Sequence, residues 1–280
     1  LRDLNDKQPK KGKPQTAEPR VNTQRDLIAY LESSEKLSDI LLVGALSGIA
    51  RHAEFEQDSN RKNRIAKVVA AVVDLPGAAG RSDDAAGWIR RQAVDILGNI
   101  GLPGNGNGYV AKLYKIIRDE KEPLPLRIAA AEALRKMDLS RLPDGVMEKL
   151  TQSLTQLASD ACDYEIVEQL RQNRPFSKPR LQHRLAAVRL AVTGDLQEEA
   201  TDGGQMAGGL MAVATDEDQA SLQKLLTEIQ KIETRLSTLA ATTPSNQVED
   251  LLQESVRGLK GLQVTEDGPQ PTAPQTAENP

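Results

Sequence analysis

The chain has 280 residues, of which 39% are hydrophobic, 27% are charged and only seven are aromatic (two Phe, one Trp and four Tyr). Because strands rely on aromatic and β-branched packing, this composition excludes a β-sandwich or β-barrel of ordinary make-up. The formal net charge is −4, and the single cysteine, Cys162, excludes an intramolecular disulfide and a thiolate-rich zinc cluster. We therefore expect an all-α protein whose core is aliphatic.

The charge is distributed unevenly along the chain. Residues 1–25 carry seven basic and three acidic residues, residues 26–194 carry 24 and 22, and residues 195–280 carry five and 15. The segment 1–22 combines lysines with prolines and has little apolar surface to bury, so we expect a disordered basic linker there. No stretch approaches the roughly 20 apolar residues that a bilayer span needs. The first residue is Leu rather than Met, which suggests a processed or cut end and leaves the compartment undetermined.

Between residues 24 and 262 the apolar residues recur with a helical period, and Gly, Pro, Asp and Ser separate the runs every 15 to 25 residues. The pattern predicts helices throughout. We expect them near residues 24–33, 37–56, 61–74, 84–100, 107–119, 124–137, 143–159, 163–172, 180–193, 218–241 and 246–262.

Two of these predicted helices share a sequence pattern. At an offset of 37 residues, segment 90–97 aligns with segment 127–134, so that Arg90 matches Arg127 and Leu97 matches Leu134. Segment 184–190 continues the apolar pattern 57 residues further on, and segment 40–46 is an earlier copy without the arginine. A second amphipathic helix follows each of the first three copies. We therefore expect helical hairpins that stack through Arg90, Leu97, Arg127 and Leu134, because one hairpin cannot bury its apolar face alone.

Segments 87–101 and 125–138 resemble the first helix of HEAT repeats, and the resemblance extends over about residues 24–194, so we expect a HEAT-like repeat domain at 23–194. It implies an armadillo-type fold, in which about four hairpins form a right-handed α-α superhelix, or solenoid. It also implies a scaffold for protein–protein interaction. The alanines at positions 129, 130, 131 and 133 leave room for a neighbouring helix to approach closely.

Catalytic chemistry is weakly represented in the sequence. HEAT-like di-iron enzymes place His-Glu pairs on successive helices, but His52 is followed by Ala53 and His183 by Arg184. A nucleophilic cysteine requires a neighbouring base, and the sequence around Cys162 shows none. The glycine-rich segment 103–108 has neither the preceding strand nor the Gly-Lys-Ser/Thr ending of a phosphate-binding loop. We expect no catalytic residues, no metal and no cofactor.

A run of basic residues marks the end of the predicted repeats. It comprises Arg171, Arg174, Lys178, Arg180, Arg184 and Arg189. The run is a candidate binding face for a protein, or alternatively for nucleic acid. Because residues 26–194 carry nearly equal numbers of acidic and basic residues, we expect a protein partner rather than nucleic acid. A HEAT-like factor for enzyme maturation is a further alternative.

The C-terminal region has its own pattern. After a predicted flexible linker at 195–217, apolar residues follow the 3-4 spacing of a heptad seam. The seam comprises Leu222, Leu225, Ile229, Ile232, Leu236 and Leu239. We expect residues 218–264 to form a helical hairpin or short coiled coil that either caps the open end of the repeats or mediates self-association. Residues 265–280 are Pro-rich, and we expect them to be disordered.

Overall fold

The computed structural model describes residues 21–34, 37–75, 81–143, 145–172, 174–194, 209–240 and 242–264. Within these ranges the chain forms ten α-helices and no strand. The prediction of an all-α protein is therefore confirmed. The predictions for residues 1–20, for most of the linker (195–208) and for the tail 265–280 lie outside the described residues.

The ten helices lie close to the predicted segments. They are α1 (Val21–Glu32), α2 (Asp39–Phe55), α3 (Ser59–Val73), α4 (Asp83–Ile100), α5 (Gly108–Arg118), α6 (Leu124–Leu134), α7 (Val146–Tyr164), α8 (Lys178–Thr193), α9 (Asp216–Thr238) and α10 (Ser245–Val264). Several helices begin at a side chain that accepts a hydrogen bond from a first-turn amide, as Ser82 does from the Ala85 amide at 3.2 Å.

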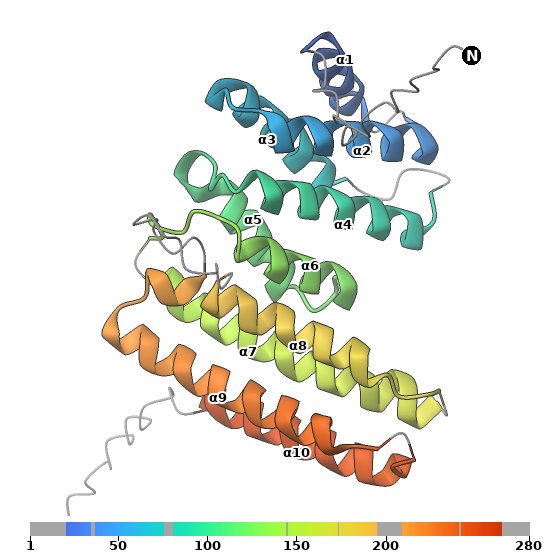
Figure 1. Ribbon diagram of the computed structural model, residues 1–280, viewed down its shortest axis with the longest axis vertical. Helices are drawn as coiled ribbons and strands as arrows, with labels where there is room; N and C mark the ends of the chain where they lie inside the picture. Colours follow the sequence, from blue (N-terminus) through green and yellow to red (C-terminus); the bar gives the residue numbers. More distant parts are fainter. Residues whose placement is uncertain are drawn as a thin grey trace, which may run out of the picture.

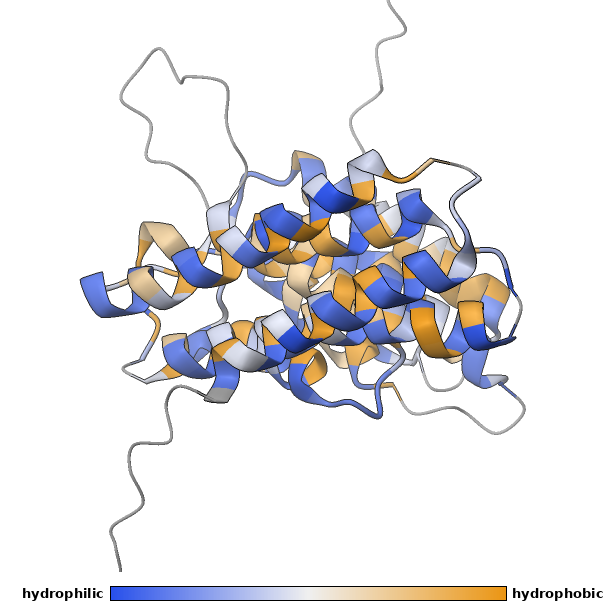
Figure 2. Ribbon diagram, turned by 90° about the horizontal axis from the view of Figure 1, so that it is seen from below, coloured by the Kyte–Doolittle hydropathy of each residue, from blue (hydrophilic) through white to orange (hydrophobic). Residues whose placement is uncertain are grey.

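The helices are arranged in two layers (Figure 1). In one layer α2, α4, α6, α8 and α9 each pack against the next. In the other layer α5, α7 and α10 pack side by side, and α1 contacts both α2 and α3. Seen along the long axis, the hydrophobic residues gather between the layers and the hydrophilic ones face outward (Figure 2). One aliphatic cluster runs from Ile28 in α1 to Leu259 in α10.

The pairing of helices differs from the hairpins that the sequence predicts. The sequence pattern predicts pairs of α2 with α3, α4 with α5, and α6 with α7, because these helices follow one another. In the structure the larger contacts are instead between α3 and α4, α5 and α6, and α7 and α8. The reason is that α6 lies against α4 and α5 at once, so α4 and α5 share little surface of their own.

Two segments are more ordered than the sequence predicts. The two helices expected at 143–159 and 163–172 are one continuous element, because α7 runs on through a π-helical turn at Glu165–Gln169 and a 3₁₀ turn at Leu170–Gln172. No Gly or Pro interrupts that stretch. In the predicted linker, Leu210 is fully buried in a 3₁₀ turn that packs on α8, and α9 begins at Asp216. Burying that leucine orders residues that composition alone assigns to a linker.

The two matching arginines make equivalent contacts. Arg90 on α4 donates from Nε to the Val73 carbonyl at the end of α3 (2.8 Å), and Arg127 on α6 donates from Nε to the Ile117 carbonyl at the end of α5 (2.9 Å). Each guanidinium also pairs with a carboxylate. Arg90 holds Glu122 through two bonds of 2.7 Å, and Arg127 lies 2.7 Å from Asp160. The arginines therefore tie α4 and α6 to C-terminal carbonyls of α3 and α5, which lack partners within their own helices.

The two leucines that share the repeated pattern with these arginines lie in the core. Leu97 and Leu134 are both fully buried. Between them α4 and α6 come so close that a β-carbon on Gly98 would lie 2.7 Å from the Ala133 Cα atom. The small side chains thus permit the close approach that the alanine run predicts.

Helix α1 contacts a carboxylate at the end of α2, and we expect this contact to be sensitive to acid. Glu56 accepts hydrogen bonds from Gln24 Nε2 and from the Asp58 amide, each at 2.8 Å. Burial alone would raise the pKa of Glu56, but these two bonds and the nearby Arg61 outweigh it and hold the pKa below its ordinary value. The folded state therefore binds this proton less readily than the unfolded state, so the stabilisation is present above the ordinary pKa and is lost as the pH falls through the lowered one.

We expect the amides of α1 to exchange faster as the pH falls below about 4.5, after correction for intrinsic exchange rates. In the variant Glu56→Gln this dependence should be weaker, because the amide carries no titrating proton. Identical pH profiles for the two proteins in hydrogen-exchange mass spectrometry would contradict this assignment.

Candidate functional site

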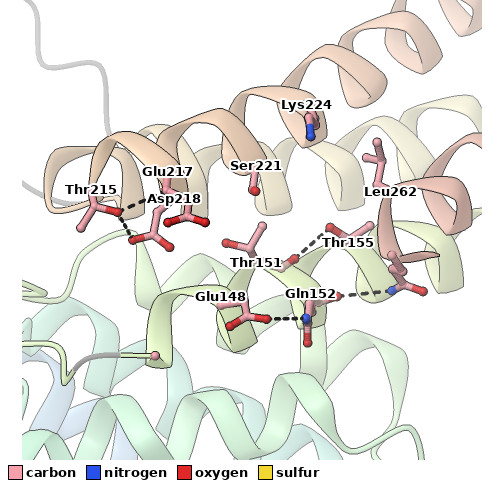
Figure 3. Close-up of a pocket in the computed structure, with 12 residues that line it drawn as sticks. Glu148, Thr151, Gln152, Thr155, Thr215, Glu217, Asp218, Ser221, Lys224 and Leu262 are labelled. Carbon is pink, nitrogen blue, oxygen red and sulfur yellow. Dashed lines mark hydrogen bonds between the residues drawn. The ribbon is translucent and has the colours of Figure 1, made fainter. Parts of the chain in front are cut away.

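A polar pocket of about 430 Å³ lies where α7, α9 and α10 meet. The first half of α7 supplies Glu148, Thr151, Gln152 and Thr155, and the start of α9 supplies most of the opposite wall (Figure 3). The end of α10 adds Leu262 and Gln263. No sequence motif predicted this pocket. The available signal was a polar stripe at positions 148, 151, 152 and 155 on a helix that is otherwise largely buried.

Most polar groups of this pocket are already bonded within the chain. Thr151 Oγ1 donates to the Met147 carbonyl (3.0 Å), and Thr155 Oγ1 donates to the Thr151 carbonyl (2.8 Å). Glu148 accepts a hydrogen bond from Gln152 Nε2 (3.2 Å), and Thr215 caps α9 by bonding Asp218. Few of the polar groups that line this pocket therefore remain unbonded for a ligand. Among its described lining residues there is no histidine or cysteine to act as a base or nucleophile.

The two histidines and the single cysteine lie on helices, and none of them lines this pocket. His52 is buried in α2, and that burial lowers its pKa, while the half-exposed His183 lies 3.5 Å from Glu132. Cys162 is fully buried on α7. Within the described ranges, no group of three or more His, Cys, Asp or Glu side chains is positioned to hold a metal ion.

The Cys162 thiol is expected to be unreactive in the folded protein. Burial, followed by the nearby carboxylates of Asp163 and Glu165, raises its pKa to about 12. Because the thiolate is the reactive form, an aromatic disulfide reagent at pH 8 should label no thiol in the native chain and one thiol after unfolding in guanidinium. Rapid stoichiometric labelling of native protein would show that Cys162 is accessible.

Two of the six predicted binding cations pair with a buried carboxylate, and of these Arg184 is buried while Arg180 stays partly exposed. Glu165 has no exposed surface, and Arg180 holds its carboxylate through two bonds of 2.8 Å. Arg184 adds a third bond of 2.9 Å and stacks over the Tyr164 ring at 4.5 Å. Burial lowers the pKa of Arg184, whereas the hydrogen bond to Glu165 raises that of Arg180. These residues join α8 to α7.

Three of the other four cations contact the C-terminal helices. Arg171 lies 3.4 Å from Glu249 of α10, and Arg189 lies 3.5 Å from Glu233 of α9. Lys178 donates to the Ser237 and Leu239 carbonyls at the end of α9 (3.1 and 3.2 Å). Among the described residues, only Arg174 of the six has neither an ion pair nor a hydrogen bond. The predicted basic face is thus mostly a set of contacts inside the chain.

The heptad seam is occupied within the chain. Leu222, Leu225, Ile229, Ile232 and Leu236 are each at most 1% exposed, and Leu239 is partly buried. They pack in the core where α9 meets α7, α8 and α10. Of the two alternatives for this hairpin, this geometry favours capping over self-association through the seam.

Exposed apolar side chains gather at the opposite end of the molecule. Among the described residues, seven large hydrophobic side chains are exposed, and five of them belong to α1, α2 and α4. They are Tyr30, Ile40, Leu41, Phe55 and Trp88. Helices α2 and α4 begin at the same edge, because Arg81 Nε lies 2.5 Å from Asp39. Ile40 and Leu41 therefore lie in the first turn of α2, and Trp88 lies in the second turn of the neighbouring α4. We call Ile40, Leu41 and Trp88 the N-terminal apolar surface, because Phe55 lies at the other end of α2.

Comparisons with protein-family models, with curated protein sequences and with solved structures find no match for this chain. None of the described helices combines the length and the apolar character needed to cross a membrane.

Proposed function

We propose that this chain is a non-catalytic, HEAT-like scaffold that binds another protein through its outer surface. The proposal includes a right-handed superhelical solenoid built from stacked helices. The equivalent contacts of Arg90 and Arg127, 37 residues apart, support the repeat character, because each arginine holds the carbonyl end of the preceding helix.

The observation that carries the binding role is the N-terminal apolar surface. Ile40 is 85% exposed, Leu41 59% and Trp88 47%, and leaving such groups in water forgoes roughly 25 cal/mol per Å² of burial. Isolated exposed apolar residues are common, but a group of them on neighbouring helices is typical of an interaction site.

The end of the molecule that α9 and α10 form has a polar outer surface. The outer groove between α9 and α10 is lined chiefly by polar and charged side chains, among them Glu228, Lys231, Arg235, Glu254 and Arg257. A polar outer face is what the terminal element of a repeat array requires for solubility. The contrast between the two ends favours a partner at the α1, α2 and α4 end.

The proposed function is tested by affinity capture from the native source with quantitative mass spectrometry. The bait proteins are the wild-type chain, the double variant Ile40→Asp/Leu41→Asp and the control Val167→Asp, which changes an exposed apolar residue far along the chain. We expect the wild-type and control baits to retain the same protein and the double variant to lose it, with equal thermal midpoints for all three. Equal capture by all three baits would contradict the assigned surface. Absence of any retained protein would contradict the scaffold role.

A further inference from the structure

A second pocket, of about 530 Å³, lies where the α7–α8 connection meets the turn between α9 and α10. Its wall is mainly apolar and includes Leu170, Phe176, Leu239 and Val248. Val248 is buried, whereas Phe176, one of two phenylalanines in the chain, is only partly buried. The volume falls within the range that accommodates a ligand group, and an apolar wall with a few polar groups at the edge is usual for such pockets.

The edge of this pocket is cationic. Lys178 lines it directly, and Arg171 and Arg174 precede the wall residue Phe176 by five and two positions. Arg174 is exposed and has no partner among the described residues. Arg171 is 58% exposed and is paired only at 3.4 Å with Glu249, a geometry that adds little stability at a surface.

The N-terminus of α8 adds to the positive potential of this edge. The helix begins after Ser177, whose side chain accepts a hydrogen bond from the Arg180 amide. Its first-turn amide dipoles favour a nearby negative charge. The facing carboxylate is Glu249, which also accepts a hydrogen bond from Gln253, and the exposed Asp250 follows it in α10. Lys178 is held by the Ser237 and Leu239 carbonyls and Arg171 by Glu249, so Arg174 is the cation of this edge that has no partner among the described residues.

We propose that this pocket binds an acidic segment of a partner protein that carries one large apolar side chain. The apolar side chain enters the space between Phe176 and Val248, and the flanking carboxylates pair with Arg174 and Arg171. Charge complementarity selects the acidic segment, since like charges at this edge would be repelled. The apolar wall selects against a bare polyanion, which has nothing to bury there.

The pocket shares no residue with the N-terminal apolar surface, so binding at each of the two sites can be tested independently. The test is a selection of displayed random 12-residue peptides on the full-length chain. The most enriched peptide is then synthesised with a fluorescent label and titrated by fluorescence anisotropy. We expect the enriched sequences to share one Leu, Ile, Phe or Trp with at least two acidic residues beside it, and we expect affinity to fall as salt rises.

Matched variants locate the bound peptide. Arg174→Glu should weaken binding by about tenfold or more, because it replaces an attracted charge by a repelled one. Ala240→Trp, which adds bulk at the pocket wall, should weaken binding without changing the charge. The control Arg257→Glu reverses a cation in the outer groove of α9 and α10, and it should bind like wild type, as should Ile40→Asp/Leu41→Asp.

Three results would overturn the proposal. The first is enrichment of peptides without acidic residues, and the second is equal peptide binding by Arg174→Glu and Arg257→Glu. The third is displacement of the peptide by a single-stranded 20-nucleotide DNA that binds as tightly as the peptide does. The last result would indicate a general anion surface. Loss of protein capture by the Ile40→Asp/Leu41→Asp bait with unchanged peptide binding would support both sites.

Discussion

Replacing Arg127 by alanine is expected to lower the free energy of unfolding by about 3 to 5 kcal/mol. The Arg127 side chain is only 4% exposed, and it holds both the Ile117 carbonyl and the Asp160 carboxylate. Removing it leaves a carbonyl and a mostly buried carboxylate without their partner, and it opens a cavity between α5, α6 and α7. Each of these consequences destabilises the folded state.

The measurement is urea denaturation followed by circular dichroism, with Arg118→Ala as the control. Arg118 is an exposed residue in the last turn of α5, so its loss should change stability by less than about 0.5 kcal/mol. Arg127→Lys should lie between the two, because a lysine keeps the charge but not the forked geometry that bonds two acceptors. A change below about 1 kcal/mol for Arg127→Ala would mean that the contact is not structural.

Two glycines of α4 should respond in opposite directions to the same substitution. At Gly98 a β-carbon would lie 2.7 Å from the Ala133 Cα atom and 2.8 Å from its Cβ atom, whereas at Gly87 nothing lies within 4 Å. Alanine at Gly87 should stabilise the protein by about 0.5 to 1 kcal/mol, because it reduces the conformational freedom of the unfolded chain. Alanine at Gly98 gains the same amount but forces α4 away from α6.

We expect Gly98→Ala to be destabilising by about 1 to 3 kcal/mol, the range usual for overpacking. Because both glycines belong to one helix, the difference between the variants isolates the packing contribution. The same urea titrations measure both changes. If Gly98→Ala stabilised the chain as Gly87→Ala does, the close contact between α4 and α6 would be wrong.

The helices could be predicted from the sequence because their signals are local. Helical apolar period, capping residues such as Ser82 and stop residues such as Gly101 act within a few positions. The close approach of α4 and α6 at Ala133 could also be predicted, since a run of alanines has few structural uses other than tight packing.

The pairing of charges could not be predicted, because it depends on residues that are distant in sequence. Arg171 meets Glu249 across 78 positions. Glu165 becomes fully buried only when α8 brings Arg180 and Arg184 against it. A sequence shows such arginines as a basic run, and only the fold shows how many remain available to a partner.

The pockets were missed for a related reason. The polar pocket of Figure 3 takes residues from α7, α9 and α10, so its lining extends from Gly145 to Gln263 along the chain. The apolar pocket at Phe176 likewise joins two turns, at residues 170–179 and 239–248. Neither carries a contiguous motif, so each requires the tertiary arrangement to be found.

All ten helices of the described ranges share one interior, which the α9–α10 hairpin closes within a single chain. Hydrogen exchange with mass spectrometry on the full-length chain, combined with light scattering, tests this arrangement most directly. We predict the mass of one chain at all concentrations, and amides around Leu225 and Ile229 as slowly exchanging as those around Leu185. A stable dimer that dissociates as those amides become exchangeable would place the seam between chains and contradict this arrangement.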